Sequence, residues 1–145
     1  LKKYDEDLKE DKFQPIVKNS KNIKIVQDAM FSSTNEVRGT SYRSRIDDPK
    51  YQFAGKTGTA QVKRITKQDR ELDLKTLEIP YEERDHALYV AYGPYRNPRY
   101  AVSILIEHGG SGSSVAAPIA KKLFKKIIDR HQIRKDFNSK KYLDI

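Results

Sequence analysis

Hydrophobic residues recur at helical spacing in two stretches of the chain. The first, Asn22–Asn35, is expected to be capped by Asn22 or Ser20. The second, Val115–His131, has one apolar face and one lysine-rich face, and Pro118 falls in its first turn, where a missing N–H costs little. Both patterns predict amphipathic helices. Their apolar positions are Ile23, Val26, Ala29, Met30 and Val37 for the first, and Ile119, Ala120, Leu123, Phe124, Ile127 and Ile128 for the second.

Three shorter stretches have the composition of β-strands. His86–Gly93 and Tyr100–Glu107 are rich in apolar residues, and a short turn with two prolines joins them, so they are expected to pair as an antiparallel hairpin. Tyr51–Val62, rich in threonine and small residues, is expected to form a third strand. Three antiparallel strands with a helix before and a helix after predict an α+β fold, in which the helices pack on the sheet.

The segments around these elements are polar. Residues 1–21 are expected to be a charged connector, and residues 132–145 a polar tail that frays. Residues 63–84 form a charged insertion in the predicted domain of residues 22–131, and this insertion is either a hairpin tip or a lid. Gly109–Ser114 is expected to be a flexible connection between the last strand and the last helix.

Composition narrows the classes of function without choosing among them. The chain has 145 residues, no cysteine, three histidines and a formal net charge of +9. Disulfides and thiolate metal sites are excluded, and the histidines lack a metal-binding spacing. Basic and acidic residues interleave, which suits either nucleic acid or an anionic wall polymer as a neighbour. No apolar run approaches the roughly 20 residues of a membrane span, and a chain beginning Leu1-Lys2-Lys3 is expected to belong to a longer protein.

The sharpest short motif is Lys56-Thr57-Gly58-Thr59, inside the third expected strand. Alternation along a strand places Lys56 and Gly58 on one face and the two threonines on the other. An ammonium group near hydroxyls makes an anion site and assists proton transfer, and a glycine lets a substrate approach the backbone. Taken alone, four residues are better explained by an ordinary strand with a solvated lysine.

The residues around this motif extend the match. The string Ala54-Gly55-Lys56-Thr57-Gly58-Thr59-Ala60-Gln61-Val62 resembles the transpeptidase domain of the class B penicillin-binding proteins, for which Lys-Thr-Gly is one of three signatures. The resemblance covers roughly residues 22–130 and is greatest toward the branch that serves rod-shape elongation. It implies the C-terminal part of the penicillin-recognising fold. The other matching pieces are Asn22–Met30, Gly39-Thr40, Asp85–Leu88, Tyr92–Pro98 and Ala101–Gly110.

The resemblance also implies roles for the motif residues. Lys56 and its strand would form one wall of the active-site cleft, and Thr57, Gly58 and Thr59 would bind the substrate, with both threonines on the carboxylate of a peptide stem or a β-lactam. The backbone N–H of Thr59 would contribute to the oxyanion hole. The family implies no cofactor, a membrane-embedded glycan polymerase as partner, no nucleic acid, and a location at the periplasmic face of the inner membrane.

One departure from the family bears on activity. Ser-x-x-Lys, which supplies the acylated serine and its activating lysine, does not occur in the chain. Ser-x-Asn occurs as Ser20-Lys21-Asn22 and Ser33-Thr34-Asn35, both nearer to Lys56 than in the family and interpreted as chance matches. The expected parent is a serine-type D,D-transpeptidase, and this chain alone is expected to be inactive. The alternatives are a carboxypeptidase or β-lactamase of the same fold, and a non-catalytic basic binding module.

Overall fold

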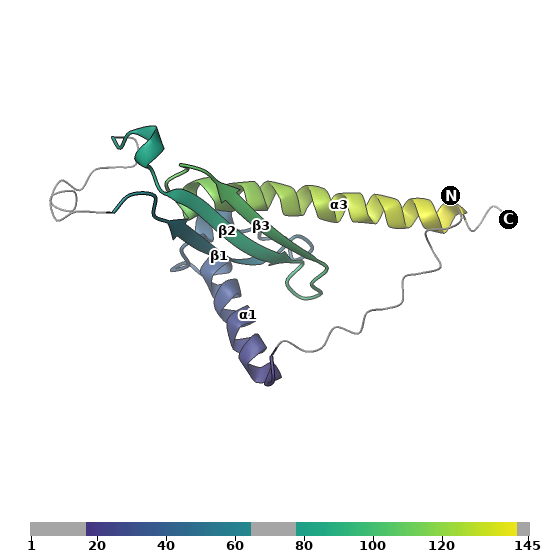
Figure 1. Cartoon of the computed structure of the whole chain (residues 1–145). Helices are drawn as coiled ribbons and strands as arrows, with labels where there is room; N and C mark the ends of the chain where they lie inside the picture. Colours follow the sequence, from purple (N-terminus) through teal and green to yellow (C-terminus); the bar gives the residue numbers. More distant parts are fainter. Residues whose placement is uncertain (1–16, 65–77, 142–145) are drawn as a thin grey trace, which may run out of the picture.

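The computed structural model describes residues 17–64 and 78–141. Figure 1 shows a central sheet of three strands, with the helix α1 before it and the long helix α3 after it. The expected α+β architecture is therefore confirmed. The elements are α1 (Ser20–Asn35), η1 (Tyr42–Ser44), β1 (Ala54–Ala60), η2 (Tyr81–Glu83), β2 (His86–Gly93), β3 (Tyr100–Ile106), η3 (Gly112–Ala116) and α3 (Ala117–Lys141).

The sheet has the order β1-β2-β3, and both pairs of neighbours are antiparallel. The predicted hairpin is confirmed, with Leu88 opposite Leu105. The third strand is shorter than the expected Tyr51–Val62, because it lasts only as long as its partner: Ala54 pairs with Tyr92 and Ala60 with His86. Since β1 has one neighbour, it is an edge strand of the described sheet.

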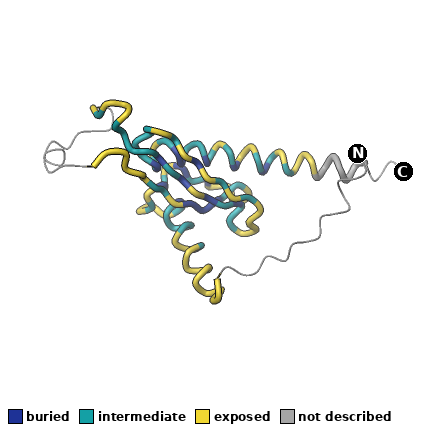
Figure 2. Tube along the Cα trace, viewed as in Figure 1, coloured by how far each residue is buried: buried dark blue, intermediate teal, exposed yellow. Residues whose placement is uncertain are grey.

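The core lies on one face of the sheet. Alternate residues of β2, namely Ala87, Tyr89 and Ala91, are buried in one cluster with residues of α3, and the Tyr89 hydroxyl also meets Thr34 of α1. The rings of Phe53 and Phe124 stack with their centroids 4.9 Å apart and join the segment just before β1 to α3. The opposite face is open among the described residues, and it carries half-exposed apolar side chains such as Val90 and Leu105. Figure 2 shows this alternation of buried and exposed positions along the strands.

Helix α1 forms as predicted, but its cap and its contacts differ from expectation. The N-cap is Asn19, whose side-chain oxygen accepts a hydrogen bond from the backbone N–H of Lys21, so both expected caps were wrong. Ile23 and Val26 of the expected apolar face are exposed. The reason is visible in Figure 2: the N-terminal half of α1 extends beyond the sheet and is exposed, whereas Thr34, near its C-terminal end, bonds Gly55 of β1.

Helix α3 is preceded by a single wide turn, η3, and it runs past the expected end at His131 to Lys141. The Gly/Ser connection is correspondingly shorter than expected, since residues from Gly112 onward are already helical. Residues 132–141 contain neither glycine nor proline and are rich in good helix formers, which lets the helix continue through the segment expected to fray. No helix among the described residues is long and apolar enough to cross a membrane.

The charged insertion is described only at its two ends. Its last residues include η2, and the ammonium group of Lys63 lies 2.8 Å from the Glu83 carboxylate, so the two ends meet. The ring of Tyr81 packs on that of His108, with centroids 5.0 Å apart. Residues 65–77, on which the hairpin-tip and lid interpretations depend, lie outside the described residues.

Candidate functional site

All four residues of the Lys56-Thr57-Gly58-Thr59 motif lie on the edge strand β1. Lys56 and Thr59 are exposed, and Thr57 and Gly58 are half-buried. The ammonium group of Lys56 donates to the carbonyl oxygen of Thr57 at 2.9 Å and to its hydroxyl oxygen at 3.3 Å. One cation and one hydroxyl are thus held together beside an accessible strand edge, which is an arrangement suited to an anion.

The hydroxyl of Thr57 continues into a chain of hydroxyl groups. Its oxygen lies 3.3 Å from the hydroxyl oxygen of Thr40, which in turn lies 3.1 Å from that of Ser33 on α1. Thr40 belongs to the loop after α1 and is exposed, whereas Ser33 is half-buried. The strand with the motif is therefore linked to the helix through side chains that the sequence motif does not contain.

The register of β1 depends on close packing beside Lys56. Gly55 lies directly against the ring of Tyr89, and a Cβ at position 55 would be 2.4 Å from the Tyr89 hydroxyl oxygen. Tyr89 itself is fully buried. The residue before the lysine must therefore be a glycine for the ring and the strand to occupy their positions.

A buried polar network lies behind the strand. The hydroxyl of Thr34 accepts from the backbone N–H of Gly55 at 3.0 Å and lies 2.9 Å from the Tyr89 hydroxyl. Ser41 donates to the carbonyl oxygen of Ser33 at 3.0 Å and lies 3.1 Å from the same Tyr89 hydroxyl. Burial raises the pKa of Tyr89, and the hydrogen bonds from Ser41 and Thr34 counteract that rise in part. Since every buried polar atom here is paired, the network fixes α1, β1 and β2 relative to one another.

Two histidines lie at the other end of β1, where Ala60 pairs with His86. The Nδ1 of His86 accepts from the backbone N–H of His108 at 2.9 Å, and the rings meet edge to face at 4.9 Å between centroids. His108 has a positive φ of 54°, an uncommon conformation that this hydrogen bond supports. Neither histidine belongs to a group that could hold a metal ion, since the described residues contain no such group.

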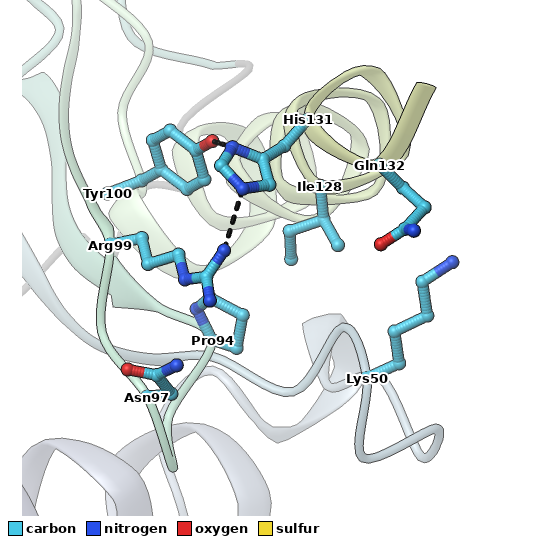
Figure 3. Close-up of a pocket in the computed structure, with 8 residues that line it drawn as sticks. All are labelled: Lys50, Pro94, Asn97, Arg99, Tyr100, Ile128, His131 and Gln132. Carbon is cyan, nitrogen blue, oxygen red and sulfur yellow. Dashed lines mark hydrogen bonds between the residues drawn. The ribbon is translucent and has the colours of Figure 1, made fainter. Parts of the chain in front are cut away.

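A separate hollow of about 160 Å³ lies at the opposite end of the sheet. In Figure 3, His131 of α3 stands between Tyr100 and Arg99, and each of these side chains is 2.6 Å from one ring nitrogen. Along β2, Leu88 opposite Gly58 and Gly93 opposite Tyr100 are five residue steps apart, which is about 16 Å at strand spacing. The hollow holds none of the expected site residues; its lining is Lys50, Pro94, Asn97, Arg99, Tyr100, Ile128, His131 and Gln132.

Comparison with known families decides how this strand is to be interpreted. The family model described as the penicillin binding protein transpeptidase domain matches residues 2–125. The chain belongs to this transpeptidase family. The match spans the motif strand, the hairpin and the first part of α3, so the family recognised from the sequence is confirmed.

Relatives within the transpeptidase family are named peptidoglycan D,D-transpeptidase MrdA. The protein from Salmonella typhimurium is 37% identical over 105 residues, covering 72% of this chain and 16% of the relative. The protein from Haemophilus influenzae is 39% identical over 94 residues, covering 65% of this chain and 14% of the relative. This chain therefore spans about a sixth of the length of the Salmonella relative that it matches.

Solved structures of penicillin-binding protein 2 share the fold. One is the complex of penicillin-binding protein 2 with MreC from Helicobacter pylori. It has a TM-score of 0.60 and 32% identity, and the match covers 75% of this chain and 17% of that chain. Another is the Pseudomonas aeruginosa protein in complex with WCK 5153, with a TM-score of 0.59, 32% identity and coverage of 79% and 21%. The resemblance to the penicillin-binding protein 2 branch is thus supported by both sequence and structure.

Sequence reasoning about this transpeptidase domain missed the residues behind the motif strand. The sequence pattern places Thr40 only within the Gly39-Thr40 match, and it makes Ser33-Thr34-Asn35 a chance Ser-x-Asn match. In the structure each of these side chains is hydrogen-bonded, and the amide of Asn35 donates to the carbonyl oxygen of Phe53 at 2.9 Å. The density of Ser and Thr before and after Gly39 was the only sequence signal for them.

Proposed function

We propose that the protein acts as a serine-type peptidoglycan D,D-transpeptidase in cell elongation, and that this chain supplies one wall of its active site. The observation that carries the proposal is the pairing of Lys56 with Thr57 on an exposed edge strand, inside a match to the transpeptidase domain. The names of the relatives, peptidoglycan D,D-transpeptidase, support the reaction.

In this reaction a serine outside the chain attacks the carbonyl carbon between the two D-alanines of a peptide stem. The terminal D-alanine leaves and an acyl-serine ester forms; an amine of a neighbouring stem then displaces the serine and forms the cross-link. Lys56 provides positive charge at the substrate carboxylate and assists proton transfer, and Thr57 and Thr59 donate to that carboxylate. Gly58 keeps this part of the strand open to the substrate backbone, and the N–H of Thr59 stabilises the oxyanion, a contribution of about 3 kcal/mol for one such donor.

The proposed partners follow from the same reaction. They are the peptidoglycan stem peptide, β-lactams as mimics of it, and a membrane-embedded glycan polymerase that supplies new strands, at the periplasmic face of the inner membrane. The complex of the Helicobacter pylori relative with MreC supports work within an assembly. No cofactor is required, because the nucleophile and the proton-transfer groups are all side chains.

Intact-mass measurement of the natural full-length protein after incubation with a penicillin tests the proposal. We expect a one-to-one covalent adduct that is lost or strongly slowed in Lys56→Ala. Lys122→Ala is the matched control, since Lys122 is an exposed lysine on the outer face of α3, and it should acylate like the unmodified protein.

The lifetime of the adduct separates the proposal from its nearest rival. A long-lived adduct supports a transpeptidase, whereas rapid turnover to a penicilloic acid would identify a hydrolase of the same fold. Absence of any adduct on a folded protein would contradict both enzymatic interpretations. Nucleic-acid binding that weakens steeply with salt would then favour the basic binding module.

A further inference from the structure

We propose that Thr40 is a positioning residue of this site: its hydroxyl donates to Thr57 and so reserves the single hydroxyl hydrogen of Thr57 for the carboxylate of the bound ligand. The inference rests on the proposed function, because it takes Thr57 as a carboxylate-binding residue. Thr40 lies outside the Lys56–Thr59 motif, and its hydroxyl is the donor in its bond to Thr57.

The geometry brings three donors to one place. The hydroxyl oxygen of Thr57 has two neighbours, the ammonium group of Lys56 at 3.3 Å and the hydroxyl oxygen of Thr40 at 3.3 Å. Behind Thr40 lies the hydroxyl oxygen of Ser33 at 3.1 Å. The Thr40 contact is longer than the usual 2.7–2.8 Å of an O–H···O bond and the Lys56 contact is longer than the usual 2.9–3.0 Å of an N–H···O bond, as is common at sites that tighten when a ligand binds.

Counting hydrogens assigns a direction to these contacts. A threonine hydroxyl has one hydrogen to donate and two lone pairs that accept, and an ammonium group can only donate. Lys56 therefore occupies one lone pair of Thr57. If Thr57 gave its hydrogen to Thr40, only a lone pair would face the ligand, and a lone pair repels a carboxylate. If Thr40 donates instead, the second lone pair is filled and the hydrogen of Thr57 stays available.

The same count of hydroxyl hydrogens and lone pairs assigns a direction to the contact between Ser33 and Thr40. Once Thr40 has used its hydrogen on Thr57, its own oxygen can accept, and Ser33 on α1 is the hydroxyl within reach. The series of hydrogen bonds then runs in one direction, with Ser33 donating to Thr40, Thr40 to Thr57, and Thr57 to the carboxylate. Successive hydroxyl donors polarise one another, which strengthens the last bond of the chain.

The backbone on both sides of Thr40 holds this residue between Ser33 and Thr57. A Cβ on Gly39 would be 2.4 Å from the carbonyl oxygen of Ser33, so only a glycine allows the loop to pass so close to the end of α1. The N–H of Ser41, on the other side of Thr40, donates to the same carbonyl at 3.0 Å. Thr40 is thus fixed at both neighbours while its own side chain is exposed, so it can be replaced without disturbing the core.

Acylation kinetics of the natural full-length protein with two ligands test the proposal. One ligand is a penicillin and the other is its methyl ester, which lacks the carboxylate charge. Thr40→Val should lower the second-order acylation rate constant for the penicillin about fivefold, in line with loss of one neutral hydrogen bond, the one that orients and polarises the Thr57 hydroxyl. It should leave the ester nearly unaffected. Thr40→Ser, which keeps the hydroxyl, should restore the rate for the penicillin.

Three further variants complete the experiment. Ser33→Ala should give a smaller loss than Thr40→Val, with the same selectivity for the carboxylate. Ser32→Ala is the matched control, because Ser32 is a neighbouring serine of α1 whose hydroxyl instead bonds Glu36 at 2.8 Å, and it should change neither rate. Thr40→Ala provides a second deletion of the hydroxyl if the valine variant fails to fold.

The other outcomes would contradict either the role of Thr40 or the proposed function. Equal losses for the penicillin and the ester, or no rescue by Thr40→Ser, would mean that Thr40 only supports the fold. No loss in Thr40→Val would remove Thr40 from the site while leaving the proposed function intact. If the unmodified protein forms no adduct with either ligand, the proposed function itself fails, and this inference fails with it.

Discussion

The hydroxyl oxygen of Tyr89 lies only 2.4 Å from the point where a Cβ on Gly55 would be. The ring cannot retreat, because Tyr89 is fully buried and its hydroxyl is held by Thr34 and Ser41. Gly55 immediately precedes Lys56, so the packing of one core tyrosine sets the position of the lysine on the edge strand. The stability of the core and the geometry of the site are therefore coupled at this pair.

Gly55→Ala is expected to lower the free energy of unfolding by about 2 kcal/mol, because the added methyl group overpacks the core. Urea denaturation followed by circular dichroism measures this change. The loss should be much smaller in a Tyr89→Leu background, where the clashing ring is gone. Equal losses in both backgrounds would contradict the assigned contact.

Tyr89→Phe is expected to lower the free energy of unfolding by about 1–2 kcal/mol, since buried hydroxyls of Thr34 and Ser41 lose a hydrogen-bond partner. The same urea experiment measures it. Tyr42→Phe is a suitable control, because Tyr42 is not fully buried and should change stability little. A Tyr89→Phe protein as stable as the original would mean that the network contributes nothing net.

The raised pKa of Tyr89 predicts a loss of stability at alkaline pH. Burial favours the protonated phenol in the folded protein, so the unfolded chain releases this proton first, near the ordinary value of about 10. Above that pH the folded state holds more protons than the unfolded state, and the free energy of unfolding falls as pH rises. Denaturation series from about pH 8 to pH 11 should show a steeper fall for the original protein than for Tyr89→Phe; parallel curves would contradict the burial effect.

Asn35→Ala is expected to lower the free energy of unfolding by about 1 kcal/mol, because the carbonyl oxygen of the buried Phe53 loses its hydrogen-bond donor. The substitution removes a hydrogen bond that joins the last turn of α1 to the segment leading into β1. Asn97→Ala, in the exposed turn between β2 and β3, is the control and should have little effect. Thermal denaturation of the three proteins under one set of conditions would decide the comparison.

Tyr100 and His131 are expected to be energetically coupled. Arg99 can only donate, so it donates to Nε2 of His131, and the ring hydrogen lies on Nδ1 and faces the Tyr100 hydroxyl. A double-mutant cycle with Tyr100→Phe and His131→Phe should give a coupling of about 1 kcal/mol between β3 and α3. A coupling indistinguishable from zero would show that this part of α3 is held by apolar contacts alone.

Local sequence patterns predicted a helix or strand well where its bounds and its buried face are set by residues within that segment. The bounds of β2 agree with the expected His86–Gly93, because an alternating apolar run beside a short turn has one way to pair. The apolar face of α3 containing Phe124 and Ile128 is buried as expected. The cap of α1 and the exposure of Ile23 were missed, since a pattern shows which face is apolar but not how much of the helix reaches the sheet.

By itself the sequence determined the family, the α+β architecture and the strand that carries Lys56, because periodicity and a motif of adjacent residues are both contained in short windows of chain. The tertiary structure alone decided what surrounds that strand. Thr34 meets a tyrosine 55 residues away, and Thr40 meets Thr57 across 17 residues. Such contacts depend on the path of the backbone through the loop after α1, and hydroxyl side chains carry no local pattern that reveals their partners.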